Sequence, residues 1–177
     1  MKRLYLPLIL FIFVILEGVA INLLPTEIVL SNYLIIAHWV LAFLVYIAIY
    51  YDTGSTYYSI MYALIFGLLI DIIYTGVLGV YMFSYGGVIY IIHGLQKLLQ
   101  RNFFVLVLLG VAAFLMADFS IYLIYFVVGI TEMVWQDYLL QRLIPTILAN
   151  LLFLLILFPI FKKNIVRWGD EQLTKGN

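Results

Sequence analysis

Long apolar runs separated by short polar breaks dominate this chain. A helix needs about 20 apolar residues to cross a membrane, and the runs have about this length. They lack the strict alternation of barrel strands, which favours helices. The expected spans are residues 4–24, 31–51, 57–73, 75–93, 102–130 and 143–161. The pattern predicts an all-α integral membrane protein, with one compact bundle of six transmembrane helices and a short tail at 162–177.

The basic residues predict an orientation for this bundle. With six spans, eight of the nine Lys and Arg residues fall on one side, and Arg142 alone falls on the other. An excess of Lys and Arg in short loops marks the cytoplasmic side of a membrane. Both termini and the tail are therefore expected in the cytoplasm. The eight residues are Lys2, Arg3, Lys97, Arg101, Lys162, Lys163, Arg167 and Lys175.

Composition narrows the function classes. Hydrophobic residues make up 67% of the chain, against roughly 45–50% in soluble domains, so no separate soluble domain is expected. Cysteine is absent, which excludes disulfides and thiolate chemistry. His38 and His93 fall near opposite faces and cannot share a metal ion. We find no metalloprotease, serine-hydrolase or phosphate-loop motif, so neither an enzyme, a metal nor a cofactor is expected. The basic residues are few and explained by topology, so nucleic acid is not an expected partner.

Several polar residues fall within the expected spans. At about 1.5 Å per residue, all of them lie in the outer half of the bilayer. An ionised carboxylate there costs roughly 2.5–3.5 kcal/mol unless it is hydrated or paired, and His38 and Arg142 are the nearest conceivable partners. Two interpretations remain open: hydrogen bonds between helices that fix their packing, or a polar cleft with a function. The candidate residues are Glu17, His38, Asp71, Asp118 and Asn150.

Glycines recur at roughly helical spacing along the fourth expected span, with two aromatic residues on the same stripe. Small residues let a second helix approach closely in a membrane. We favour packing within the bundle, and the functional alternative is a docking face for another membrane protein. The candidate docking face is Gly79, Phe83, Gly86, Gly87 and Tyr90.

Two motifs resemble those of the MreD family of rod-shape-determining membrane proteins. The first is Gly-x-x-x-Asp followed by a small-residue turn and Leu-Gly. The second is the Pro-Thr element that opens the last span. Chain length, span count and the basic tail also agree with this family. The matching residues are Gly67, Asp71, Thr75, Gly76, Leu78 and Gly79 in the first motif, and Arg142, Pro145, Thr146 and Asn150 in the second.

The resemblance implies a non-enzymatic scaffold of the cell-elongation machinery in the cell membrane. Its implied partners are MreC, a RodA-type polymerase, a transpeptidase and, indirectly, MreB, with membrane lipid around it. We expect Asp71 and the Gly76/Gly79 turn to fix the hairpin of the third and fourth spans, and Pro145 to fix the start of the last helix. The bundle is also similar to the substrate-binding subunits of energy-coupling transporters. A small-molecule-binding subunit is therefore the alternative, and an enzyme acting on lipid-linked intermediates is a weaker third hypothesis.

Overall fold

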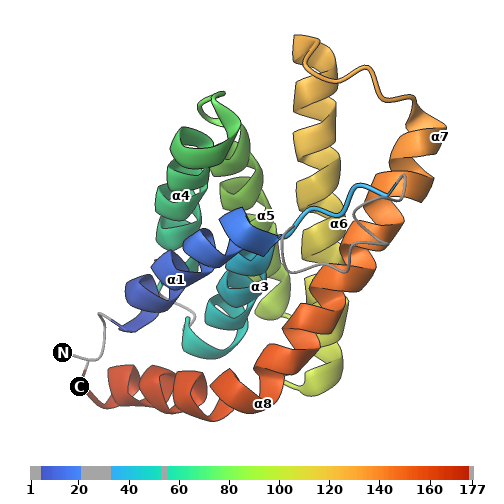
Figure 1. The fold of residues 1–177 in the computed structure, drawn as a ribbon. Helices are drawn as coiled ribbons and strands as arrows, with labels where there is room; N and C mark the ends of the chain where they lie inside the picture. Colours follow the sequence, from blue (N-terminus) through green and yellow to red (C-terminus); the bar gives the residue numbers. More distant parts are fainter. Residues whose placement is uncertain (1–4, 21–32, 53–55, 176–177) are drawn as a thin grey trace.

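The computed structural model of the chain describes residues 5–20, 33–52 and 56–175, with side chains as far as Gly169. Every regular element in these ranges is a helix (Figure 1), so the prediction of an all-helical bundle is confirmed. The elements are α1 (Tyr5–Val19), α3 (Trp39–Tyr46), η3 (Ile47–Tyr51), α4 (Tyr58–Ile70), η4 (Asp71–Thr75), α5 (Val80–Gln96), α6 (Phe103–Val128), α7 (Trp135–Asp137), η5 (Tyr138–Leu143) and α8 (Ile144–Lys175).

Three helix boundaries differ from the expected spans. Residues 33–38 of the second span are extended, and its helix starts only at Trp39. In the fourth span, α5 starts at Val80, because Gly76 and Gly79 adopt positive φ angles that end one helix and precede the next. The last helical run begins at Trp135 and continues to Lys175. Apolar residues occur in helices and in extended chain alike, so an apolar run does not show where within it a helix begins or ends. Residues 21–24 and 31–32 of the expected spans lie outside the described residues.

α3 is the central helix of the bundle. Every residue from Val40 to Tyr51 is buried, and α3 contacts α1, α4, α5, α6 and α8. The sequence of this segment has no polar face, and a helix that is apolar all round can be enclosed by protein or face lipid; here the neighbouring helices enclose it. The helical segment Trp39–Tyr51 is only about 20 Å long, which is short of a bilayer core of about 30 Å. The extended residues 33–38 continue its path.

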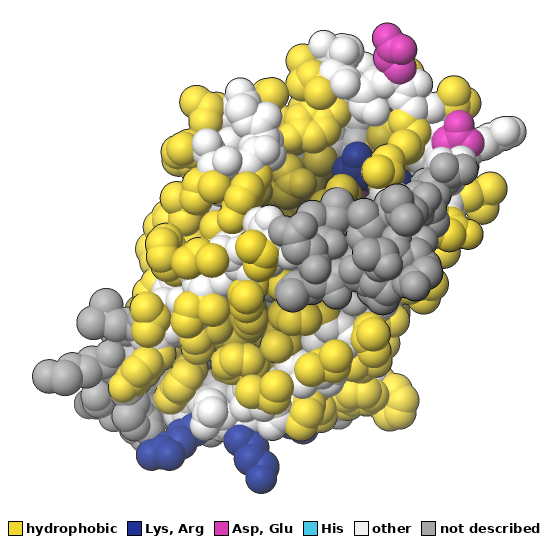
Figure 2. Space-filling view, in the orientation of Figure 1, with side chains coloured by type: hydrophobic (Ala, Val, Ile, Leu, Met, Phe, Trp, Pro, Cys, Tyr) yellow, Lys and Arg dark blue, Asp and Glu magenta, His cyan; other side chains and the backbone are white. Residues whose placement is uncertain are grey.

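Three helical runs are long and apolar enough to cross a membrane: Tyr58–Thr75, Phe103–Val128 and Trp135–Gly169. Tyr5–Val19 and Trp39–Tyr51 are apolar but shorter. Figure 2 shows a broad apolar surface, with Lys and Arg side chains at the lower edge and Asp and Glu side chains at the top. This is a membrane protein. The number of crossings and their orientation stay predictions.

The two ends of the bundle differ in structure. One end carries the turn at Gly76 and Gly79 together with α7, and we call it the hairpin end. The other carries the α5–α6 loop and the last part of α8, and we call it the tail end. Proline cannot donate the helical hydrogen bond, and we attribute the bend in the lower part of α8 (Figure 1) to Pro159.

The expected tail continues α8 and packs against the tail end of the bundle. Ile165 is fully buried, and the Trp168 ring stacks on Tyr5 with 5.8 Å between ring centroids. Gly169 lies against the backbone of η3, where an added Cβ would be 2.7 Å from the Tyr50 carbonyl oxygen. Tertiary packing therefore orders this segment as a helix lying across the lower end of the bundle (Figure 1).

Close glycine contacts pack α4 against α5. A Cβ added to Gly67 would lie 2.7 Å from the Met82 Cα, and one added to Gly86 would lie 2.6 Å from the Leu64 Cδ2. Both glycines therefore permit close approach within the bundle. Gly87 differs, since it is exposed and an added Cβ would meet no atom within 4 Å.

These contacts predict opposite effects for two Gly→Ala substitutions. Gly67→Ala places a methyl group against the α5 backbone and should lower the free energy of unfolding by about 1–3 kcal/mol. Gly87→Ala, the matched control, should leave it unchanged or raise it by up to about 1 kcal/mol through helix propensity. Unfolding of the purified protein in detergent measures both. Equal destabilisation by the two variants would contradict this account of the α4–α5 contact.

Candidate functional site

A polar network joins five segments of the chain towards the hairpin end. Its side chains come from α1, the extended segment 33–38, α5, α6 and the helical run from η5 into α8. The network comprises Glu17, His38, Tyr85, Asp118, Arg142, Thr146 and Asn150. His38, Asp118, Thr146 and Asn150 are buried, and Glu17 is partly exposed.

Thr146 and Asn150 hold the backbone of the extended segment. The Thr146 Oγ1 accepts a hydrogen bond from the Ile36 N–H (3.1 Å). The Asn150 Oδ1 accepts from the His38 N–H (2.6 Å), and its Nδ2 donates to the Ile36 carbonyl (2.7 Å). Alternate residues of an extended chain are about 6.6 Å apart, and helix positions i and i+4 are about 6 Å apart. One face of α8 therefore matches one edge of the extended segment.

Pro145 contributes to the same arrangement in an unexpected way. We expected it in the first turn of a separate last helix, but the helical run already begins at Trp135. Proline lacks an N–H, so it leaves the carbonyl four residues earlier without its helical donor. That carbonyl belongs to Gln141, and it accepts a hydrogen bond from the Leu34 N–H (2.8 Å). The proline thus exposes an acceptor for the extended segment.

Asp118 on α6 pairs with the basic groups of the network. Its Oδ1 accepts hydrogen bonds from the Arg142 Nε (3.2 Å) and Nη2 (3.1 Å), and it lies 3.5 Å from the His38 Nε2. The other ring nitrogen of His38, Nδ1, lies 2.8 Å from the Tyr85 hydroxyl. On α1, the Glu17 Oε1 accepts from the Val40 N–H at the start of α3 (2.8 Å). These contacts link the first turn of α3 to four neighbouring segments.

The structure brings together three of the five predicted polar residues: His38, Asp118 and Asn150. Glu17 adjoins them through α3, whereas Asp71 lies separately at the hairpin turn. His38 precedes its helix instead of lying within it. Tyr85 was not predicted from the sequence as a member of the network. Thr146 could have been predicted as one, because its i, i+4 spacing to Asn150 places both residues on one helix face. Six buried side-chain atoms have no hydrogen-bond partner among the described residues, and three of them lie in or beside this network: His38 Nε2, Asp118 Oδ2 and Tyr138 Oη.

Asp71 binds the start of the helix that follows it. Its carboxylate accepts hydrogen bonds from the backbone N–H groups of Gly79 (2.9 Å), Tyr81 (2.9 Å) and Met82 (3.1 Å). The first N–H groups of a helix have no partner within it and carry partial positive charge, which favours a carboxylate there. Thr75, the other predicted polar residue of this turn, donates to the Asp71 carbonyl (3.1 Å).

Asp52 plays the equivalent part at the tail end, which sequence reasoning missed. Its buried carboxylate accepts hydrogen bonds from the Tyr58 N–H (3.1 Å), the Ser59 N–H (2.9 Å) and the Ser59 hydroxyl. Burial raises the pKa of Asp52, against the lowering effects of the Ser59 hydrogen bonds and of nearby His93. The two helices of the α4–α5 hairpin are thus each bound at the N-terminus by an aspartate from the preceding segment.

Comparison with known proteins decides which family this chain belongs to. The family model for the rod shape-determining protein MreD matches residues 1–166. The chain is also 30% identical over 162 residues to the rod shape-determining protein MreD of Bacillus subtilis (strain 168), covering 92% of each chain. This chain belongs to the MreD family. No solved structure matches it.

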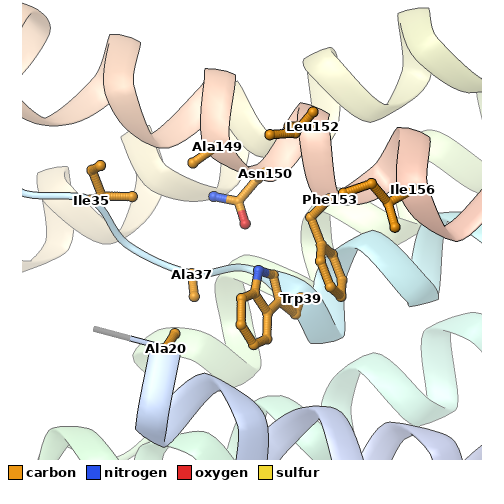
Figure 3. A pocket seen from close by; sticks show the side chains of 9 residues that line it. All are labelled: Ala20, Ile35, Ala37, Trp39, Ala149, Asn150, Leu152, Phe153 and Ile156. Carbon is orange, nitrogen blue, oxygen red and sulfur yellow. The ribbon is translucent and has the colours of Figure 1, made fainter. Parts of the chain in front are cut away.

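An apolar pocket opens beside the polar network of this MreD-family chain. It has a volume of about 230 Å³ and lies between the extended segment and α8 (Figure 3). The rings of Trp39 and Phe153 stack at one side with 4.7 Å between centroids, and Asn150 is its polar lining residue. Sites for drug-sized ligands occupy about 300–1,000 Å³, so this pocket is small for such a ligand. Among the described residues, no group of three metal-ligating side chains occurs.

Replacing the buried Asn150 should destabilise the protein more than the same replacement at the exposed Asn164. Asn150→Leu leaves the His38 N–H and the Ile36 carbonyl without their partner, at about 1–3 kcal/mol for each buried group. Unfolding in detergent measures the loss. The control is Asn164→Leu in the exposed part of α8, which should change stability by less than about 0.5 kcal/mol. Equal effects would show that Asn150 does not hold the extended segment.

Removing the Asp71 carboxylate should loosen the hairpin end. Asp71→Ala leaves three N–H groups of α5 without their acceptor, and we expect a loss of about 2 kcal/mol or more. Hydrogen exchange should rise first at Gly79–Met82, which mass spectrometry can localise. Asp137→Ala, at an exposed position on α7, is the matched control and should leave that exchange unchanged. Unaltered protection of α5 in Asp71→Ala would refute the capping role.

Proposed function

We propose that this protein is a non-enzymatic scaffold of the machinery that determines rod shape. It lies in the cell membrane as a multi-pass protein with both termini in the cytoplasm. It docks the single-span partner MreC laterally and thereby holds wall-synthesis enzymes near one another. Membership of the MreD family and similarity to the rod shape-determining protein of Bacillus subtilis support the rod-shape role.

One exposed stripe on α5 carries the docking proposal. Phe83 and Tyr90 are 69% and 66% exposed, and the exposed Gly87 lies between them. Positions 83, 87 and 90 share one helix face, and Gly94 extends it by another turn. An added Cβ would meet no atom within 4 Å at Gly87 or Gly94. The stripe therefore combines two exposed aromatic side chains with exposed glycines, which suits close approach of a second transmembrane helix.

The expected glycine face divides into two parts. Gly86 packs against α4, and Gly79 forms the turn before α5, so both serve the fold. Gly87 points away from the neighbouring helices and remains accessible. The docking face that we propose is therefore Phe83, Gly87, Tyr90 and Gly94, which we call the α5 stripe.

The polar network supports a structural role more than a chemical one. Thr146 and Asn150 form hydrogen bonds with the backbone of the extended segment, and Glu17 accepts one at the start of α3. The pocket beside Asn150 keeps a small-molecule-binding function as the second candidate. Saturable binding of a small apolar ligand, weakened by Ala149→Phe in the pocket wall, would favour that candidate over the scaffold.

Filling the α5 stripe should weaken partner recruitment. Gly87→Leu places a large side chain on the stripe, where its Cβ meets no atom of the protein within 4 Å but the side chain would clash with a docked helix. We expect recovery of MreC with the tagged protein, after gentle solubilisation from a rod-shaped host, to fall at least tenfold. Val127→Leu enlarges a 76% exposed position on α6 and is the control. Undiminished recovery with Gly87→Leu, at normal protein levels, would exclude the α5 stripe as the docking face.

A further inference from the structure

Basic side chains gather around the tail end of the bundle. They come from the α5–α6 loop and from α8 after its bend, and Figure 2 shows Lys and Arg atoms along the lower edge. Neither residues 96–102 nor residues 158–168 include an Asp or Glu. The residues are Lys97, Arg101, Lys162, Lys163 and Arg167.

Aromatic contacts join the two basic segments into one surface. Phe103, at the start of α6, packs edge-to-face on Phe158 of α8, with 4.9 Å between ring centroids. The Lys162 ammonium lies over the Phe158 ring, 4.7 Å from its centroid. These contacts connect Lys162, through Phe158, to the start of α6, two residues after Arg101 in the chain. Cation–π contacts of this kind position an ammonium group without neutralising it.

The loop itself forms an open groove with a fixed charge at one end. The groove has a volume of about 640 Å³ and is lined by Gln96, Lys97, Leu99, Gln100 and Arg101. The Arg101 Nη2 donates a hydrogen bond to the Asp52 carbonyl (2.9 Å), and this bond orients the guanidinium. The carbonyl is neutral, so the bond does not neutralise the charge of the guanidinium. The Lys97 ammonium lies 5.3 Å from the centroid of the Tyr57 ring.

Large apolar side chains flank these charges at the surface. Leu98 is 83% exposed and Phe104 is 80% exposed, on either side of Arg101. A face that met only water or a soluble acidic protein would leave these side chains in water. The boundary of a bilayer accommodates both kinds of group, because apolar side chains enter the acyl region while Lys and Arg reach the head groups.

We propose that the surface formed by Lys97, Arg101 and Lys162 binds the phosphate head group of an anionic phospholipid. The lipid's acyl chains would lie against Leu98 and Phe104, and its phosphate would occupy the groove of the α5–α6 loop. Lys163 extends the same positive surface along α8. Basic pockets between membrane helices recognise anionic head groups in this manner. The site would add a lipid preference to the protein, and it shares no residue with the α5 stripe, although Lys97 lies one turn beyond Gly94 at the end of α5.

Lipid retention by the purified protein tests this proposal. Protein in detergent is titrated with dioleoyl phosphatidylglycerol or with dioleoyl phosphatidylcholine, and bound lipid is counted by native mass spectrometry. We expect a preference for phosphatidylglycerol. In Lys97→Gln/Lys162→Gln that preference should fall by about fivefold for each charge removed. Arg101 is left unchanged, because its contact with Asp52 also serves the fold.

Two control variants and two competing ligands separate the proposal from its alternatives. Lys97→Arg/Lys162→Arg keeps the charge and should keep the preference. Glu132→Lys adds a positive charge at the hairpin end and should leave the lipid preference unchanged.

An unaltered preference in the Gln variant, with wild-type thermal stability in phosphatidylcholine, would overturn the proposed site. Equal thermal stabilisation by soluble glycerol phosphate would assign it to a free anion, and displacement of the lipid by a soluble polyglutamate peptide would assign it to an acidic protein. Either of these two results would overturn the lipid assignment.

Discussion

The hydrogen bonds of one short extended segment govern the arrangement of this bundle. Backbone N–H and C=O groups at membrane depth need partners inside the protein, because hydrocarbon offers none. Residues 33–38 cannot supply their own partners as a helix would. Thr146, Asn150 and the carbonyl exposed by Pro145 supply them from α8. The position of α8, and with it the central placement of α3, follows from this requirement.

The same constraint explains why acidic residues occur within apolar segments. Asp71 and Asp52 each accept hydrogen bonds from the N-terminus of a helix, and Glu17 accepts one at the start of α3. Carboxylates are costly in an apolar environment unless they accept several hydrogen bonds or meet a positive charge. Asp118 meets the second condition through Arg142. The four acids are therefore integral to the fold, and their chemistry needs no substrate to explain it.

A rigid interior leaves the outer surface free for interaction. The α4–α5 pair is fixed by Gly67 and Gly86 on its inner side, so α5 can present the α5 stripe on a supported helix. The basic surface lies at the tail end and involves different residues. In our proposal, one protein thus carries a lateral face for a partner helix and, at the tail end, a surface for lipid head groups. The two surfaces share no residue, and they meet where Lys97 follows Gly94 by one helical turn.

Apolar run lengths were enough to predict an all-helical membrane protein, and the motifs around Asp71 and Pro145, together with chain length, span count and the basic tail, were enough to predict the family. The same apolar runs could not show that residues 33–38 are extended, because Leu, Ile and Ala are equally apolar in either conformation. Nor could one sequence show that His38, Asp118 and Asn150 meet, since they lie on three segments whose rotation about their axes is set by packing.

The sequence by itself determined that the protein is all-helical and rich in apolar residues, and that Thr146 and Asn150 lie on one helix face. Only the tertiary structure decided what that face binds. It also decided that Gly86 packs inward while Gly87 faces outward, although the two are adjacent in sequence. The physical reason is that local sequence fixes the period of an element, whereas its partners depend on contacts between residues more than 100 positions apart.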